Sequence, residues 1–290
     1  MTEPFAIDKR QARRAFGHAA AGYDRAAVLQ REVCGRMLER LSYVKQSPSA
    51  ILDAGSGTGY AARKLRARYP GAEVIELDLA LPMLLRARAA APWWQRLRAR
   101  AVLRICADIE RLPLVPAAVG MVWSNLTLQW VNDLRAVLAQ FQRVLEPGGL
   151  LMFSTFGPDT LKELRAAYRA ADPSTHVHRF VDMHDIGDLL LEAGFADPVM
   201  DMEQITLTYA GVLQLMRELK AIGAGNAAAD RPRGLTGKAR LAAVERDYER
   251  FRSGGRLPAT FEVVYGHAWK PRPRVGPAGR AVIDIKSERS

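Results

Sequence analysis

Apolar residues recur along the first half of the chain in short runs, and a longer amphipathic pattern separates each run from the next. The runs have the length of strands and occupy residues 50–53, 73–78, 102–107, 121–124 and 150–155. Helical periodicity lies between them, at residues 60–69, 82–90 and 134–145. Strands that alternate with helices form parallel pairs, so the pattern predicts an α/β fold with a mostly parallel sheet and helices on both faces.

The second half of the chain has longer segments. Its pattern predicts four helices, at residues 161–171, 185–193, 212–222 and 238–251. Two further strands are expected at residues 204–209 and 260–268, which brings the sheet to seven strands. A helical pattern at residues 26–41 precedes the first strand.

These patterns divide the chain into three parts. We expect an N-terminal helical leader or lid at residues 1–45 and one α/β domain at residues 46–270, with a lid-forming helical insertion at about 210–255. The Gly-, Ala-, Pro- and Arg-rich linker 223–237 is expected to be a mobile loop. The segment from Lys270 onward, residues 271–290 above all, has the composition of a disordered tail.

Composition narrows the classes of protein. No apolar run approaches the roughly 18 residues that span a bilayer, so we expect a soluble, cytoplasmic protein without membrane contact. Two cysteines far apart, Cys34 and Cys106, exclude a disulfide framework. The net charge of +11 favours acidic partners, among which nucleic acid, acidic proteins and phosphorylated metabolites all remain open, and any single arginine is more simply a solvated surface residue.

A glycine loop follows the first predicted strand, where Asp53 precedes Gly55, Ser56, Gly57 and Gly59. Dinucleotide loops space their last two glycines three residues apart, whereas here the spacing is two. The tighter loop and its acid suit a ligand with an ammonium and a carboxylate but no pyrophosphate, which points to S-adenosylmethionine on a Rossmann-like sheet. The alternative is a purely structural glycine turn.

Acidic residues end the next two strands. Asp78, followed by Leu79, is expected to accept hydrogen bonds from ribose hydroxyls, with a helix N-cap as the alternative or additional role. Asp108 is expected to accept a hydrogen bond from the adenine amine while Ile109 packs on the ring.

Asn125 ends the fourth strand and is expected to face the reacting end of the ligand. The sequence after it is Leu126-Thr127-Leu128 and not the Pro-Pro-aromatic sequence of amino-methyltransferases that act on bases, so we expect no nucleic acid as substrate. Tyr23 and Gln30 are seven residues apart and would share one face of a helix that folds over the cofactor. The histidines lack metal-ligand spacing, so no metal is expected.

Residues 10–270 resemble the malonyl-[acyl-carrier protein] O-methyltransferases of biotin synthesis. The resemblance rests on the glycine loop and on more specific segments, which are Phe16 with Ala19-Ala20 and Tyr23-Asp24, Ser124-Asn125-Leu126 with Gln129-Trp130, Phe153-Ser-Thr-Phe156-Gly157, His176-Val-His-Arg179-Phe180, Met216-Arg-Glu-Leu-Lys220 and Tyr265-Gly-His-Ala-Trp269.

This resemblance implies transfer of the methyl group of S-adenosylmethionine to the free carboxylate of a malonyl thioester, on acidic acyl-carrier protein or on coenzyme A. No general base is required, because that carboxylate is already ionised at neutral pH. Arg179 and Lys220 are the candidate cations for the substrate carboxylate, Tyr23 is the expected gate, and Asn125 is expected to position the reacting groups.

Two rival functions remain at this stage. One is an assembly factor that resembles a protein-arginine hydroxylase and binds S-adenosylmethionine without transferring its methyl group. The other is a non-catalytic, cofactor-binding interaction protein, since one fold hosts many functions.

Overall fold

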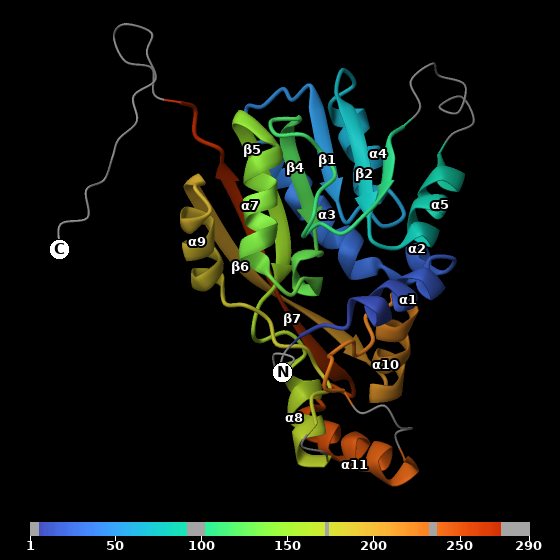
Figure 1. The fold of residues 1–290 in the computed structure, drawn as a ribbon. Coiled ribbons are helices and arrows are strands. Elements are labelled where there is room, and N and C mark those ends of the chain that lie inside the picture. Colours follow the sequence, from blue (N-terminus) through green and yellow to red (C-terminus); the bar gives the residue numbers. More distant parts are fainter. Residues whose placement is uncertain (1–5, 92–101, 172–173, 232–236, 274–290) are drawn as a thin grey trace, which may run out of the picture.

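The computed structural model describes residues 6–91, 102–171, 174–231 and 237–273. It forms one seven-stranded sheet in the order β3-β2-β1-β4-β5-β7-β6 (Figure 1). The strands are β1 Ala50–Ala54, β2 Glu73–Asp78, β3 Arg104–Cys106, β4 Val119–Asn125, β5 Leu145–Phe156, β6 Ala196–Tyr209 and β7 Leu257–Trp269. Strands β1 to β5 pair in parallel, and β7 runs antiparallel to both β5 and β6. The predicted fold class is confirmed.

Helices cover both faces of the sheet. They are α1 Lys9–Ala19, α2 Tyr23–Ala26, α3 Val28–Leu41, α4 Tyr60–Arg68, α5 Leu81–Ala90, α7 Leu134–Val144, α8 Lys162–Ala171, α9 Met183–Glu192, α10 Val212–Ala221 and α11 Lys238–Tyr248, with 3-10 turns at Leu128–Trp130 and Glu249–Phe251. None of the helices in the described part of the chain has the length and apolarity that crossing a membrane requires.

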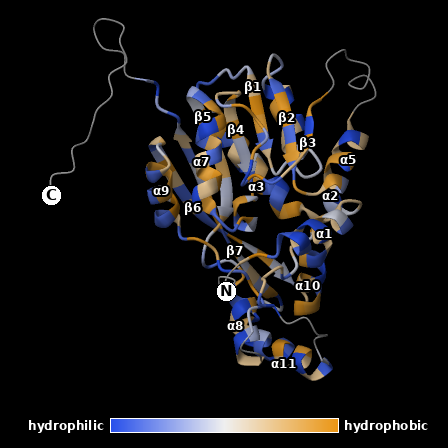
Figure 2. Ribbon diagram, in the orientation of Figure 1, coloured by the Kyte–Doolittle hydropathy of each residue, from blue (hydrophilic) through white to orange (hydrophobic). Residues whose placement is uncertain are grey.

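The core has two layers, one on each side of the sheet. Ile51 of β1 packs in the layer that holds α3 and α4, and the next residue, Leu52, packs in the layer that holds α7 and α9. Successive side chains of a strand point to opposite faces, so a strand buried on both sides must be apolar at consecutive positions. Figure 2 shows the apolar residues gathered on the central strands and on the inward sides of the helices.

The β6–β7 hairpin is longer than the rest of the sheet. Strand β5 pairs only with residues 263–269 of β7, so residues 257–262 pair with β6 alone. Helices α8, α10 and α11 gather at this end of the hairpin, away from β1 and β2 (Figure 1). The hairpin therefore carries a helical extension beside the carboxyl ends of the parallel strands.

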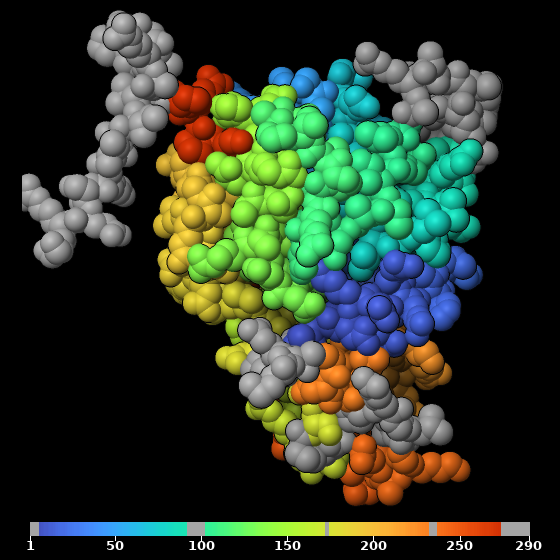
Figure 3. All heavy atoms as spheres, viewed as in Figure 1, coloured from blue at the N-terminus to red at the C-terminus, as the bar shows by residue number. Residues whose placement is uncertain are grey.

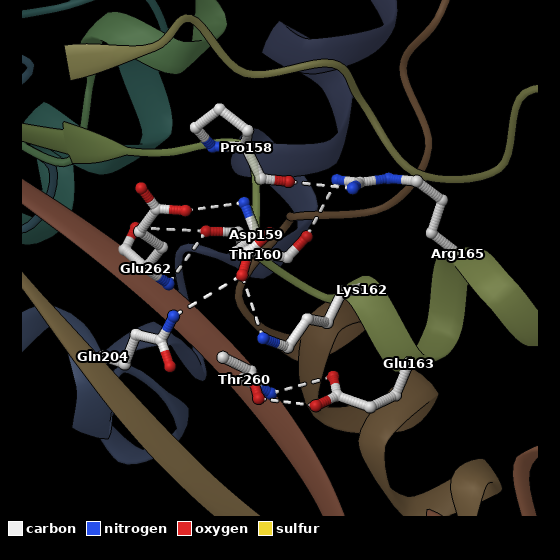
Figure 4. A network of polar contacts seen from close by, with 9 residues as sticks. All are labelled: Pro158, Asp159, Thr160, Lys162, Glu163, Arg165, Gln204, Thr260 and Glu262. Carbon is white, nitrogen blue, oxygen red and sulfur yellow. Dashed lines mark hydrogen bonds and ion pairs between the residues drawn. The ribbon is translucent and has the colours of Figure 1, made fainter. Parts of the chain in front are cut away.

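Buried polar contacts fasten this extension to β7 (Figure 4). The carboxylate of Glu163, on α8, accepts hydrogen bonds from the backbone N–H and the hydroxyl of Thr260. Glu262 accepts from the backbone N–H of Asp159 at 2.7 Å, and the Arg165 guanidinium donates to the carbonyls of Pro158 and Thr160 at 2.8 and 2.9 Å. These bonds fix the loop that leaves β5.

Several predicted boundaries were wrong, each for a local reason. The helix expected at residues 26–41 is broken at Ala27, whose ψ of 50° is not helical, so it begins at Val28. Strand β6 begins at Ala196 and not at residue 204, because its first half is a partly exposed edge with alternating polar residues. Strand β5 begins at Leu145, ahead of the glycine turn expected to precede it.

The part of the expected mobile linker that the structure describes forms backbone hydrogen bonds with the N-terminal segment. Ala227 accepts a backbone hydrogen bond from Asp8 at 2.8 Å, and Ala229 donates one to Ala6 at 2.7 Å. Lys270 is also fixed, because its ammonium donates to the carbonyls of Gln142 and Leu145, both at 2.8 Å. Residues 232–236 and 274–290, which complete the linker and the tail, lie outside the described residues.

Replacing Glu163 with leucine should destabilise the protein. Glu163 is 6% exposed, and its loss leaves two donors of Thr260 buried without an acceptor. We expect the free energy of unfolding in urea to fall by about 2 kcal/mol. Glu39→Leu removes an exposed carboxylate and should change it by less than about 0.5 kcal/mol. Equal losses in the two variants would contradict the role given to Glu163.

Candidate functional site

The glycine loop between β1 and α4 is shaped by its neighbours. Gly55, Gly57 and Gly59 have φ of +83°, +52° and +76°, which favour glycine over residues with a side chain. A Cβ on Gly55 would lie 2.1 Å from the Thr127 hydroxyl oxygen, so no other residue fits there. The loop backbone is therefore held against the residues that follow β4.

Three cavities open where the parallel strands end. We name them after one residue each. The Asp53 cavity is lined by Tyr23, Asp24, Ala27, Gln30, Arg31, Asp53, Gly55, Ser56, Gly57, Thr58, Tyr60, Ala61 and Asn125. The Asp78 cavity shares Tyr23, Gly55, Gly57 and Asn125 with it and adds residues from the ends of β2 and β3. The Arg179 cavity lies beside the Asp78 cavity, with which it shares Val131.

Buried acceptors without a partner distinguish the Asp53 cavity. Gln30 Oε1, Asp53 Oδ2 and Ser56 Oγ are buried and have no hydrogen-bond partner among the described residues. Burying a polar atom without a partner is costly, so such atoms at a cavity wall indicate a ligand that satisfies them. Two acceptor oxygens and a hydroxyl suit the ammonium and carboxylate of an amino acid.

Asp53 is the most perturbed carboxyl of the site. Burial, with the nearby charge of Glu76, raises the pKa of Asp53 to about 8. Glu76 itself has two cationic partners, Arg66 at 2.7 Å and Arg104 at 2.6 Å. Asp53 has no ion pair with a described residue, so a bound ammonium would supply the missing charge.

Asp78 binds two backbone N–H groups at the end of β2. Its carboxylate accepts hydrogen bonds from the backbone N–H groups of Gly57 and Ala80, both at 2.8 Å. The first of these ties β2 to the glycine loop. The N-cap of α5 is Ala80, so the expected N-cap role of Asp78 was wrong. Burial raises the pKa of Asp78 to about 6, and these two donors counteract part of that rise.

Asp108 and Ile109 line the Asp78 cavity, as does Leu79. Asp108 forms an ion pair with Lys9 of α1 at 2.5 Å, and Lys9 also contacts Glu110 at 2.7 Å. No local sequence pattern predicts this pair, because the partners are 99 residues apart. Helix α1 is thereby held across the open side of the cavity.

Asn125 joins three elements. Its amide Nδ2 donates to the Gln30 carbonyl on α3 at 3.0 Å, and its Oδ1 accepts from the Ser154 hydroxyl on β5 at 3.0 Å. Leu126, the next residue, has a φ of +48°, an unusual value for a residue with a side chain. The chain therefore turns sharply at the cavity wall and keeps Asn125 between the Asp53 and Asp78 cavities.

Tyr23 and Gln30 do not share a helix. Tyr23 begins α2 and Gln30 lies in the first turn of α3, so the expected common helix face was wrong, although both residues line the Asp53 cavity. Desolvation of the phenol, with the nearby carboxylate of Asp78, raises the pKa of Tyr23 above its ordinary value. The phenol therefore stays protonated at neutral pH.

The two candidate substrate cations lie apart from each other. Both are exposed, but Arg179 lines a cavity that also contains Phe156, His178 and Phe180, whereas Lys220 on α10 lines none of the three cavities. Burial lowers the pKa of His178, whose Nε2 accepts from the Ala227 backbone at 3.3 Å, so the ring is neutral.

Trp130 separates the Arg179 and Asp78 cavities. Its ring packs edge-on against Phe16 at 5.0 Å between centroids and against His178 at 5.2 Å. Phe16 and Trp130 belong to the sequence motifs of the family resemblance, but no role in the site was predicted for them. Aromatic residues at both ends of a cavity wall exclude water from the space between them.

Comparison with known proteins identifies the family. A family model described as a methyltransferase domain matches residues 52–153. The chain is 57% identical over 280 residues to the malonyl-[acyl-carrier protein] O-methyltransferase of Gallionella capsiferriformans (strain ES-2), and the match covers 96% of this chain and 97% of the relative.

Solved structures share the fold. The YcgJ protein from Bacillus subtilis has a TM-score of 0.58 at 13% identity, over 83% of this chain and 99% of that chain. Phosphoethanolamine N-methyltransferase 2 of Haemonchus contortus, solved in complex with S-adenosyl-L-methionine, has a TM-score of 0.50 at 16% identity, over 82% of this chain and 52% of that chain.

The resemblance drawn from the sequence motifs is therefore confirmed over almost the whole chain. Because it matches a relative nearly end to end with more than half of the aligned residues identical, the chain belongs to the malonyl-[acyl-carrier protein] O-methyltransferase family and is a methyltransferase that uses S-adenosylmethionine.

Proposed function

We propose that this chain transfers the methyl group of S-adenosylmethionine to the free carboxylate of a malonyl thioester carried by acyl-carrier protein, which gives the methyl ester that begins pimeloyl and biotin synthesis. The relative from Gallionella carries the name of this reaction. The observation that carries the proposal is the Arg179 cavity, which lies directly beside the Asp78 cavity and has both a cation and apolar side chains in its wall. A short dicarboxylate thioester has the matching chemistry, with one anionic end and an apolar arm.

The cofactor residues are proposed from the polar atoms that face the cavities. Asp53, Ser56 and Gln30 hold the amino-acid end, because their unpartnered buried atoms line that cavity. Asp78 and Leu79 hold the ribose, and Asp108 and Ile109 hold the adenine. The glycines let the backbone approach the ligand closely.

When bound, S-adenosylmethionine supplies a methyl group on a positively charged sulfur. A carboxylate oxygen forms the new bond to the methyl carbon, the sulfur–carbon bond breaks, and its electron pair stays on sulfur. The substrate carboxylate has an ordinary pKa near 4 and is already ionised at neutral pH, so no side chain must remove a proton. The products are the methyl ester and S-adenosylhomocysteine.

The side chains of the chain therefore act by positioning and by excluding water. Asn125 fixes the wall between the Asp53 and Asp78 cavities through its two hydrogen bonds. Tyr23 lines both of these cavities. Its raised pKa keeps the phenol protonated, so it can donate a hydrogen bond but cannot act as a base. Holding the reactants in line contributes on the order of 7–11 kcal/mol in well-oriented systems, which is the largest effect available here.

Arg179 binds one oxygen of the substrate carboxylate in this proposal and leaves the other oxygen to react. A carboxylate that accepts two charged hydrogen bonds is a weaker nucleophile, so a single contact is the better arrangement. Methylation removes the negative charge, which weakens the contact with Arg179. Product release is then favoured by the reaction itself.

Purified protein incubated with methyl-labelled S-adenosylmethionine and malonyl-acyl-carrier protein tests the proposal. We expect label in a base-labile ester of the malonyl group. Binding of the cofactor without any ester product would support a non-catalytic interaction protein, and an unlabelled hydroxylated arginine peptide would support the assembly factor.

Asp53→Asn should abolish the release of a proton on cofactor binding. At pH 7 free Asp53 is largely protonated, since its pKa is about 8, and the cofactor ammonium favours its ionised form. Wild-type protein should release close to one proton per cofactor, and affinity should rise with pH between 7 and 8, where Asp78 is already ionised. Titration calorimetry in two buffers of different ionisation enthalpy measures this number. The same number in both proteins would refute the role of Asp53.

Arg179→Ala should raise KM for the malonyl substrate. Loss of one charged hydrogen bond to a carboxylate costs about 1.5–3 kcal/mol, which corresponds to roughly tenfold or more in KM. Kd for S-adenosylmethionine, measured by calorimetry, should stay within about twofold. Lys220→Ala is the matched comparison and should change KM less, because Lys220 lies outside the cavity. Equal effects of Arg179→Ala on substrate and cofactor would remove Arg179 from the substrate site.

A further inference from the structure

Helix α1 has an inner and an outer face with different properties. Ala12 and Phe16 line the Asp78 cavity, whereas Arg10 and Arg14 lie two positions away, about 200° around the helix. Arg10, Arg13 and Arg14 are exposed. Figure 3 shows the N-terminal helices as a continuous part of the surface, between the sheet and the helices of the extension.

A neighbouring helix extends this outer face. Gly17 of α1 packs against Pro82 of α5, since a Cβ on Gly17 would lie 3.5 Å from the proline ring. Arg86, one helical turn after Pro82, is exposed. We call Arg10, Arg13, Arg14 and Arg86 the basic face.

The basic face lacks compensating negative charge. Neither α1 nor α5 contains an aspartate or glutamate. Within the described ranges, none of the four guanidinium groups has an ion pair or hydrogen-bond partner. Arg10 and Arg14 are spaced so that like charges repel on one helix face, and Arg10 lies in the first turn, where the helix dipole disfavours a cation.

Such an arrangement weakens the isolated helix and is relieved by an external anion. Acidic side chains elsewhere in the chain are already engaged nearby, since Asp8 pairs with Arg231 and Asp108 with Lys9. The relieving charge therefore has to come from another molecule. Several arginines spread along a helix fit an extended acidic surface better than a single small anion.

The location of the basic face relates it to the reaction. Ile7, just before α1, lines the Arg179 cavity, and Lys9, Ala12 and Phe16 line the Asp78 cavity. Helix α1 is thus part of the wall of the Asp78 cavity and begins beside the Arg179 cavity, with its basic face turned outward. A macromolecule bound there has its closest part next to the place where substrate and cofactor meet.

From this arrangement we infer that the basic face is the docking surface for an acidic carrier domain that presents the thioester substrate on a flexible arm. This inference rests on the proposed function and extends it to the partner. The carrier binds through its acidic side chains to the outer face of α1, and the arm passes the rim into the Arg179 cavity.

The test compares two triple variants that lose the same charge. R10Q/R13Q/R14Q neutralises the α1 part of the basic face, and K45Q/K238Q/R246Q neutralises three exposed cations outside it. Binding of fluorescently labelled malonyl-acyl-carrier protein is measured by anisotropy at increasing salt concentrations. KM is measured both for this carrier and for malonyl-N-acetylcysteamine, a thioester without carrier or phosphate.

We expect R10Q/R13Q/R14Q to weaken carrier binding and raise KM for the carrier by roughly tenfold, and to flatten the dependence on salt. KM for malonyl-N-acetylcysteamine and Kd for S-adenosylmethionine should stay within about twofold, which also shows that the variant is folded. The second triple variant should bind the carrier like wild type.

Carrier binding that is unchanged in R10Q/R13Q/R14Q, or weakened equally in both variants, would overturn the inference. Preferential binding of RNA or of anionic vesicles to the same arginines would overturn it as well. Failure of the proposed function has a different signature, because wild-type protein would then bind the carrier through the basic face but methylate neither thioester.

Discussion

The site depends on the side-chain hydrogen bonds of Asn125, because one of them ties helix α3 to the end of β4, a link that the pairing of β4 with β5 does not supply. Its amide joins the end of β4 to the start of α3 on one side and to β5 on the other. The bond to α3 holds Gln30 at the wall of the Asp53 cavity. Tyr23 is held there by its neighbour Asp24, which accepts a hydrogen bond from the Thr58 hydroxyl at 2.5 Å. This position requires a side chain that donates one hydrogen bond and accepts another. An ionised aspartate only accepts hydrogen bonds, and leucine forms none.

The electrostatics of the strand ends complement a cationic ligand. Asp53 and Asp78 lie at the ends of the adjacent strands β1 and β2, and burial makes each harder to ionise than in water. Glu76, which lies opposite Asp53 on the paired strand β2, forms ion pairs with two arginines, but neither aspartate forms an ion pair with a described residue. A cationic ligand bound at these strand ends would therefore favour the ionised form of both aspartates.

Local sequence patterns were sufficient to predict the parallel strands and the glycine loop. Consecutive apolar residues such as Ile51 and Leu52 identify a strand buried on both faces, and the spacing of Gly55, Gly57 and Gly59 identifies the ligand loop. The pairing of β7 between β5 and β6 is not a local property, and the partly exposed first half of β6 has no apolar run to reveal it. For the same reason, the contacts of α1 could not be predicted. Lys9 forms an ion pair with Asp108, and the backbone N–H of Asp8 donates to the Ala227 carbonyl. Both contacts join segments that are far apart in the sequence.

The position of β7 inside the sheet has a consequence for biosynthesis. Strand β5 ends at Phe156, but β7, which pairs with its free edge, begins only at Leu257. About a hundred residues are therefore translated before β7 can cover the edge of β5. Until then β5 presents an open, apolar edge to other nascent chains, and β6 has no partner at all. The sheet is therefore completed only when its last strand, β7, inserts between β5 and β6. Slow translation of the β6–β7 region would prolong the time during which the nascent chain can aggregate.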